Sequence, residues 1–113
     1  KRSYCYLADI VSALFTIMFL GKSTEAYNIA SEKSVTTIVG LASKLVSLFP
    51  EKNLKLLYSL PEEKDKKQFT FIENAVLDSS KIERLGWKAA YDLDEGLKRT
   101  IWSMTKEDSE HEK

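Results

Sequence analysis

The amino-acid sequence predicts a small α+β unit with about four helices and three to five short strands. Two observations support this class: stretches with helical apolar spacing alternate with short aromatic or β-branched runs, and no internal repeat or low-complexity tract interrupts them. Of 113 residues, 43% are hydrophobic and 11% aromatic, which is enough for a core and too apolar for a disordered chain. We expect a folded unit at residues 1–104 and a charged, disordered tail at residues 105–113.

The first half of the chain predicts two strands and two helices. Residues 3–7 are a short aromatic run typical of a strand, and residues 8–20 have helical spacing, with Asp9 in the first turn and Gly21 at the C-terminal cap. Residues 25–30 predict a second strand, and Ser34 predicts the N-cap of a helix over residues 35–49 that ends at Pro50. We expect the apolar stripe of the first helix to be buried; it consists of Ile10, Val11, Leu14, Phe15 and Met18.

The second half predicts further short strands and two helices. Residues 54–59 suit a strand, residues 61–68 a solvated loop, and residues 69–71 and 75–77 short extended segments. Asp78 or Ser79 would cap a brief helix as far as residue 85, followed by a Gly86 C-cap and Trp87 in the core. Asp92 and Glu95 form a capping-box pair for a last helix through residue 104. Its expected inner face consists of Leu93, Leu97, Ile101 and Met104.

Composition excludes several classes of function. The 17 basic and 17 acidic side chains cancel, so the broad positive field that nucleic-acid binding needs is absent. Cys5 has no second cysteine for a disulfide, and His111 has no second ligand at metal spacing. The longest apolar run, residues 10–20, is too short for a bilayer, so we expect no membrane partner.

Catalytic and cofactor motifs are missing from this stretch. The four glycines are scattered, so no glycine loop could hold the pyrophosphate of a dinucleotide. His111 lies beyond the expected folded unit, which leaves no Ser-His-Asp or Cys-His arrangement, and no tyrosine has a lysine four residues later. The chain opens at Lys1 without an initiator methionine or signal peptide, so we expect it to be cut from a longer protein.

Four segments resemble one family in the same order. Arg-Ser-Tyr-Cys-Tyr-Leu-Ala-Asp-Ile at residues 2–10, Tyr-Asn-Ile at residues 27–29, Leu-Asp-Ser-Ser-Lys-Ile-Glu-Arg-Leu-Gly-Trp at residues 77–87 and the helix at residues 93–101 are similar to segments of extended short-chain dehydrogenase/reductase enzymes. These are NAD-dependent nucleotide-sugar epimerases and dehydratases. The resemblance covers residue 2 to about residue 104 and falls in the family's C-terminal third.

The resemblance implies that residues 1–104 are the C-terminal substrate-binding domain of such an enzyme. The Rossmann domain, with the NAD glycine motif and the catalytic tyrosine and lysine, would be absent from this chain. NAD would belong to the parent enzyme and not be bound by this segment, which would be inactive alone and cytoplasmic in origin. Family members use the matching arginine on the substrate diphosphate and the matching aromatic against the nucleotide, which here are Arg2 and Tyr4. Alternation along a strand would put both on one face.

Other interpretations of the same residues stay open. Arg2 could be a solvated terminus and Tyr4 a core aromatic residue. Residues 66–71, Lys-Lys-Gln-Phe-Thr-Phe, lack the second arginine and the aspartate that many family members carry before the segment matching residues 77–87. The chain could also be a stand-alone, non-enzymatic α+β binding or self-association module. An apolar face without its Rossmann partner would allow a homodimer in either case.

Overall fold

The computed structural model describes residues 1–59 and 74–111, with side chains as far as residue 105. Its elements are β1 (Arg2–Ser3), α1 (Leu7–Leu20), β2 (Val35–Thr36), α2 (Ile38–Leu48), α4 (Ser80–Glu83) and α5 (Leu93–His111), with short 3-10 helices at Glu32–Ser34 and Pro50–Lys52. The α+β class and the expected four helices are confirmed within these ranges. The loop expected at residues 61–68 and the strand expected at residues 69–71 lie outside the described residues.

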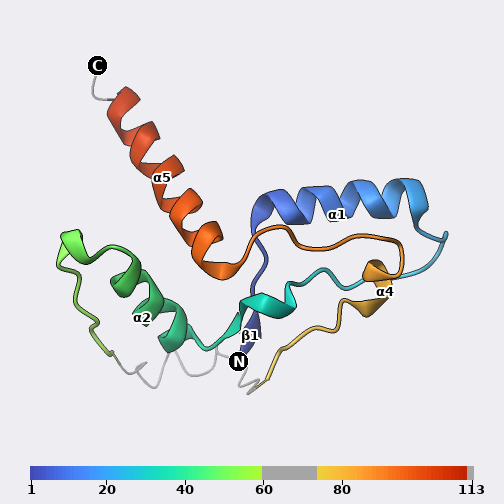
Figure 1. Ribbon diagram of the computed structural model, residues 1–113, viewed down its shortest axis with the longest axis horizontal. Helices are drawn as coiled ribbons and strands as arrows, with labels where there is room; N and C mark the ends of the chain where they lie inside the picture. The colour runs from blue at the N-terminus through green and yellow to red at the C-terminus, as the bar shows by residue number, and fades with distance from the viewer. Residues whose placement is uncertain (60–73, 112–113) are drawn as a thin grey trace, which may run out of the picture.

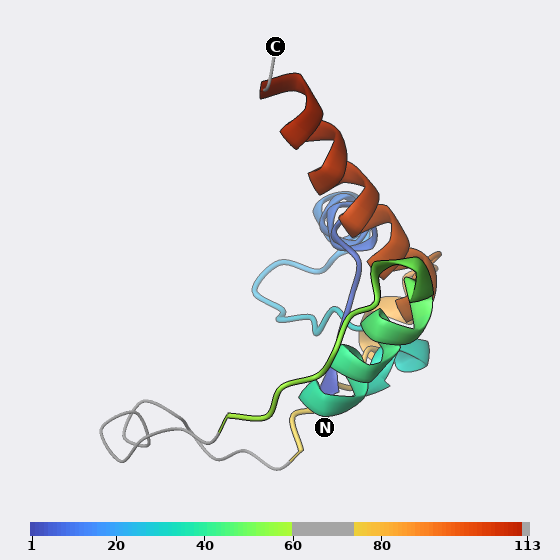
Figure 2. The ribbon, with the colours of Figure 1, turned by 90° about the vertical axis from the view of Figure 1, so that its left-hand side faces the viewer.

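The strand β1 lies at the centre of the arrangement. It pairs antiparallel with β2, with Arg2 opposite Thr36, and Arg2 also forms an isolated parallel bridge with Ala75. In Figure 1, α1 and α4 lie on one side of β1 and α2 on the other, while α5 runs away from the centre. Figure 2, turned by 90°, shows the same divergence of α5. The radius of gyration is 17.3 Å, against about 13 Å for a compact domain of this length, so the arrangement is open.

The helix α1 is apolar on two sides, and its buried side is the opposite of the expected one. Asp9 and Ala13 are its buried residues. The predicted buried stripe was wrong except for the half-buried Ile10, because its other members point to solvent. We call the solvent side the outer face of α1; its side chains are 44–74% exposed and belong to Leu7, Val11, Leu14, Phe15, Met18 and Phe19.

A small core joins α1 to α4. Ala13, Ile82 and Trp87 are buried together, and the Trp87 indole Nε1 donates a hydrogen bond of 2.9 Å to Ser12 Oγ, so the core position expected for Trp87 is confirmed. Asp78 Oδ1 accepts from the Ser80 amide at 2.8 Å at the start of α4. Gly86 follows this helix with φ +95°, a conformation that glycine adopts without steric cost.

Several predicted strand boundaries were wrong. The strand expected at residues 3–7 is only Arg2–Ser3, and α1 already begins at Leu7. Residues 25–30 and 54–59 are outside any strand, because no described segment forms a ladder with them. The second strand is instead Val35–Thr36, where a helix was expected. The helix starts later because Thr37, not Ser34, is its N-cap: Thr37 Oγ1 accepts from the Gly40 amide at 2.9 Å.

The helix α5 begins where the sequence predicts and ends later. Asp92 Oδ1 accepts from the Glu95 amide at 2.9 Å, which confirms Asp92 as the N-terminal cap. The Glu95 carboxylate does not complete the capping box but accepts a hydrogen bond from Arg99 Nε at 2.8 Å. The helix continues to His111 instead of ending at residue 104.

Candidate functional site

Arg2 is held by its backbone and leaves its side chain available. On one side β1 pairs with β2, and on the other the Ser3 amide donates to the Ala75 carbonyl at 3.3 Å while the Ala75 amide donates to the Lys1 carbonyl at 2.9 Å. The Arg2 side chain is half-buried. Within the described part of the chain, no hydrogen bond or ion pair engages its guanidinium. A fixed backbone with an unengaged guanidinium suits an anion-binding residue.

Tyr4 lies just beyond the end of β1, in the wall of a cavity of about 330 Å³. The Tyr4 amide donates to the Ser34 carbonyl at 2.8 Å, which fixes the residue against the segment before β2. The cavity is formed by residues 4–7, by Ser34, by Leu41 of α2, by Asp92 and by residues of α5 between 93 and 103. Arg2 does not contribute to this wall, so the two candidate residues, which are two positions apart along the chain, do not line the same cavity.

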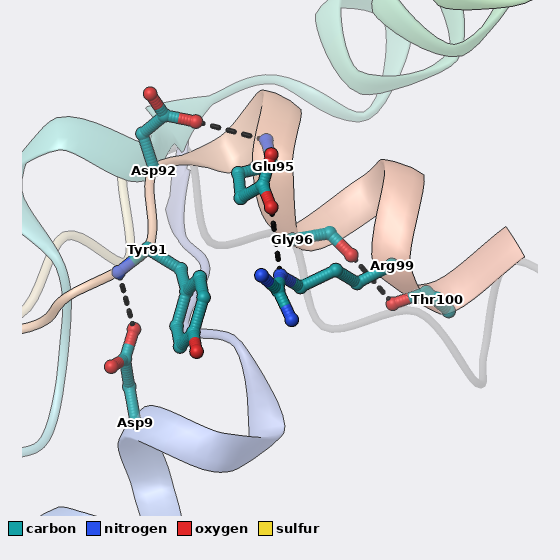
Figure 3. Close-up of polar contacts among 7 residues, drawn as sticks. All are labelled: Asp9, Tyr91, Asp92, Glu95, Gly96, Arg99 and Thr100. Atoms are coloured by element: carbon teal, nitrogen blue, oxygen red, sulfur yellow. Dashed lines mark hydrogen bonds and ion pairs between the residues drawn. The ribbon is translucent and has the colours of Figure 1, made fainter. Parts of the chain in front are cut away.

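A buried carboxylate positions the start of α5 relative to α1. Asp9 is 2% exposed and accepts two backbone hydrogen bonds, from the Ala90 amide at 2.9 Å and the Tyr91 amide at 3.1 Å. Figure 3 shows Asp9 on α1 reaching the chain that leads into α5. The sequence indicated only a helix-dipole role for this aspartate. Its long-range partners, more than 80 residues away, had no local signal.

Aromatic contacts support the same junction. The Tyr6 and Tyr91 rings meet edge to face with centroids 5.0 Å apart, and the Arg99 guanidinium lies 4.7 Å from the Tyr91 ring centroid. A cation over an aromatic face is attracted by the ring quadrupole. Glu95 accepts from Arg99 in turn, so the first two turns of α5 form one connected group with the start of α1 (Figure 3).

Gly96 is a cavity residue that the sequence analysis did not select. It lies on α5 and is buried, and a Cβ added at Gly96 would lie 3.3 Å from Tyr6 Cβ. Its missing side chain therefore allows α5 to approach the start of α1. Glycine lowers helix stability, so a glycine inside a predicted helix was the available signal for such a close approach.

Cys5 lines the cavity as a half-buried free thiol. Burial raises the pKa of the Cys5 thiol above its usual value, and the negative charge of Asp9 raises it further. The neutral thiol is therefore favoured, which is the opposite of what a nucleophilic cysteine requires.

The four glycines of this chain do not form the glycine-rich turn of a dinucleotide-binding site. They fall at the end of α1, in the first turn of α2, after α4 and inside α5, so they do not meet in one loop. A dinucleotide pyrophosphate needs consecutive backbone amides at a glycine-rich turn into a helix.

No helix among the described residues is long and apolar enough to cross a bilayer.

Comparison with known proteins shows which enzymes these segments are similar to. The chain is 31% identical over 102 residues to the trifunctional UDP-glucose 4,6-dehydratase/UDP-4-keto-6-deoxy-D-glucose 3,5-epimerase/UDP-4-keto-L-rhamnose-reductase of Arabidopsis thaliana; the match covers 88% of this chain and 14% of that protein. It is 29% identical to dTDP-D-glucose 4,6-dehydratase of Mus musculus over 89% of this chain and 28% of that protein. For dTDP-glucose 4,6-dehydratase 1 of Escherichia coli the identity is 25%, over 92% and 29%. No protein-family model matches the chain, and no solved structure matches it significantly.

These similarities confirm the resemblance that the four motifs indicate. The chain is a homologue of enzymes of the extended short-chain dehydrogenase/reductase family that act on nucleotide sugars. More particularly, the relatives are 4,6-dehydratases, and this chain matches their C-terminal part. It spans less than a third of the length of each of these relatives.

Proposed function

We propose that this chain is the nucleotide-sugar-binding segment of an NAD-dependent sugar epimerase or dehydratase of the cytoplasm. The observation that carries the proposal is the set of relatives, whose names specify reactions of UDP-glucose or dTDP-glucose. The substrate class is therefore a nucleoside diphosphate linked to a hexose. The guanidinium of the half-buried residue Arg2 and the ring of Tyr4 are the groups proposed to contact it.

Arg2 is proposed to bind the diphosphate. A guanidinium is planar and donates two parallel charge-assisted hydrogen bonds to a phosphate, which an ammonium does not reproduce. Support comes from the absence of any acidic partner for Arg2 among residues 1–59 and 74–105, because an arginine already paired with a carboxylate would have to lose that partner first. Its position in the middle of the β1, β2 and Ala75 pairing gives the guanidinium a rigid base.

Tyr4 is proposed to lie against the nucleotide. Tyr4 lines a cavity with a mainly apolar wall that includes Leu7, Leu41 and Leu97, and a planar base packs well against such a surface. The two residues thus bind different parts of the ligand. Arg2 binds the charged diphosphate, and Tyr4 contacts the flat, apolar part.

The remaining chemistry belongs to a preceding Rossmann domain in the parent enzyme. NAD supplies hydride transfer when it is bound there. This chain contributes no glycine cradle and no tyrosine-lysine pair, so its part in the reaction is to bind and orient the sugar nucleotide.

Titration of the purified 113-residue chain tests this division of roles. NAD, UDP-glucose and dTDP-glucose are each added separately and in pairs, while heat release and the NADH absorbance are followed. We expect no NAD turnover and no tight NAD binding. The heat released on adding a nucleotide sugar should exceed that released on adding free glucose. Turnover of NAD by the chain alone would contradict the proposal.

A second candidate function is self-association without catalysis, which the outer face of α1 favours. Exposed apolar patches of this kind mark interaction surfaces. The DNA upstream of the Lys1 codon separates the two candidates. A glycine-rich βαβ unit and a tyrosine-lysine pair encoded there support the enzyme, whereas a start codon at or near Lys1 supports the stand-alone module.

A further inference from the structure

We infer that Ser3 is a positioning residue for Arg2: its hydroxyl holds residues 75–78 along β1 and so fixes the backbone from which the guanidinium extends. The inference rests on the proposed function, because it deepens the role given there to Arg2. The juxtaposition that carries it is a hydrogen bond of 3.0 Å from the Leu77 amide to Ser3 Oγ. It joins residues 74 positions apart, on the side of β1 that does not face β2.

This hydrogen bond stands at the point where the parallel pairing of β1 ends. Arg2 and Ala75 form one parallel bridge, in which the Ala75 amide donates to the Lys1 carbonyl at 2.9 Å and the Ser3 amide to the Ala75 carbonyl at 3.3 Å. In a continuing parallel ladder the next bond would run from the Leu77 amide to the Ser3 carbonyl. The Leu77 amide donates to the Ser3 hydroxyl instead. The hydroxyl therefore lengthens a single bridge by one bond and keeps the paired segment beside Arg2.

Ser3 is placed to act on Arg2 without contacting the ligand. Side chains alternate along a strand, so the Ser3 side chain lies on the face of β1 opposite to that of Arg2. Its hydroxyl already accepts the Leu77 amide. A substitution at Ser3 therefore leaves the guanidinium in the protein and changes only how firmly its backbone is held.

Residues 75–78 are tied to the rest of the chain at a second point. Asn28 Nδ2 donates to the carbonyl of Asp78, the residue after Leu77, at 3.2 Å. The Ser3 and Asn28 bonds thus join three of the four segments that resemble the enzyme family, which are residues 2–10, 27–29 and 77–87. These segments together build the support of Arg2.

Loss of the Ser3 hydroxyl should affect affinity more than stability. Leu77 is 46% exposed, so water can take the place of the hydroxyl at its amide, and the unfolding midpoint should change little. A loosely held β1 has extra backbone freedom, which binding of the diphosphate must then remove. The expected result is weaker binding of nucleotide sugars by a protein of nearly normal stability.

Two substitutions at Ser3 test the inference in the chain extended upstream to the start codon of its gene. Ser3→Ala removes the hydroxyl, and Ser3→Thr keeps it. Calorimetric titration with UDP-glucose and dTDP-glucose should show binding about three- to tenfold weaker for Ser3→Ala and unchanged for Ser3→Thr. Affinity for NAD should be unchanged in both variants. Amide exchange at Leu77 and Ala75 should be at least about tenfold faster in Ser3→Ala.

Ser12→Ala is the matched control. Ser12 Oγ also accepts from a distant N–H group, the Trp87 indole at 2.9 Å, but this bond lies beside the core between α1 and α4. Ser12→Ala should lower the unfolding midpoint and leave nucleotide-sugar affinity unchanged, which is the reverse of the result expected for Ser3→Ala.

Unchanged nucleotide-sugar affinity in Ser3→Ala, or unchanged exchange at Ala75, overturns the inference. Equal weakening of binding in Ser12→Ala also overturns it, because the effect is then one of general stability. Equal weakening in Ser3→Thr does so as well, because the hydroxyl is then not responsible. An unsubstituted protein that binds no nucleotide sugar rejects the proposed function instead, and exchange at Ala75 then decides whether Ser3 holds the Arg2 backbone.

Discussion

Asp9 links two parts of the chain that are far apart in sequence. Its carboxylate replaces water at the amides of Ala90 and Tyr91, and the residue is almost fully buried. Buried backbone amides need a partner, so the loop before α5 is held in place by this side chain. Tyr6 and Tyr91 then meet beside it, which places α5 across the cavity from Tyr4.

We predict that Asp9→Ala destabilises the chain strongly. Each amide left without a partner costs about 1–3 kcal/mol, and two amides are affected. Asp9→Asn should lose less, because its amide oxygen still accepts a hydrogen bond. Urea denaturation followed by tryptophan fluorescence measures both variants. A midpoint for Asp9→Ala equal to that of the unsubstituted chain would show that the two hydrogen bonds contribute nothing.

Cys5 should react slowly with iodoacetamide. Burial, with the added effect of Asp9, raises the pKa of its thiol, so less of the reactive thiolate exists at any pH below that value. The pH profile of alkylation should have its inflection above that of the same chain unfolded in urea. Because the pKa of the Cys5 thiol is higher in the folded chain, its contribution to stability is fully present at pH values below the unfolded-state pKa. This contribution is lost as pH rises through the folded-state pKa. An inflection at or below that of the unfolded chain would contradict this assignment.

At the scale of the elements, α5 depends on its N-terminal cap. Asp92→Ala should lower the free energy of unfolding by about 0.5–2 kcal/mol, because the Glu95 amide loses its acceptor. Asp92→Ser keeps a capping oxygen and serves as the matched variant. Circular dichroism at 222 nm during urea unfolding measures the effect. Equal unfolding curves for the Asp92→Ala and Asp92→Ser variants would contradict the capping role of Asp92.

Helices were easier to predict from the sequence than strands, for a physical reason. A helix makes its hydrogen bonds within one segment, so the periodicity of α1 and the Asp92 cap were sufficient to predict α1 and the start of α5, whereas α4 ends at Glu83 with Arg84 as its C-cap, before the predicted Gly86 cap. A strand requires a ladder partner, and residues 25–30 have strand composition but lie beside α4, whose Lys81 Nζ donates a hydrogen bond to the Ala26 carbonyl, without forming a ladder with any described segment. The direction of the α1 stripe also depended on the partner, since both sides of that helix are apolar. Of the site, the sequence suggested Arg2 and Tyr4 by resemblance, but Asp9 and Gly96 act through distant contacts.

At the scale of the whole molecule, this segment leaves much of its surface exposed. The accessible area is 9264 Å², whereas a compact protein of 12.9 kDa exposes about 6,300 Å². The buried hydrophobic residues among those described are few: Ala13, Ala30, Ile82 and Trp87. Polar contacts between distant parts of the chain, such as the Asp9 hydrogen bonds to the amides of Ala90 and Tyr91, supplement this small core.

We predict that the isolated chain binds the hydrophobic dye ANS in its native state. Six large side chains on the outer face of α1 offer the dye an apolar surface. Phe15→Glu should reduce the dye fluorescence, while Lys98→Glu on the exposed side of α5 should not. Equal fluorescence from the two variants would show that the dye binds elsewhere.

The affinity of the parent protein for nucleotide sugars tests the central claim most directly. Arg2→Lys keeps the positive charge and removes the planar guanidinium, so only the paired hydrogen bonds to the diphosphate are lost. Calorimetric titration of the extended chain with UDP-glucose and dTDP-glucose should show binding at least about tenfold weaker than in the unsubstituted protein, a loss of about 1.4 kcal/mol. Affinity for NAD should not change. Unchanged nucleotide-sugar affinity in the Arg2→Lys protein would contradict the assignment of this strand to the substrate.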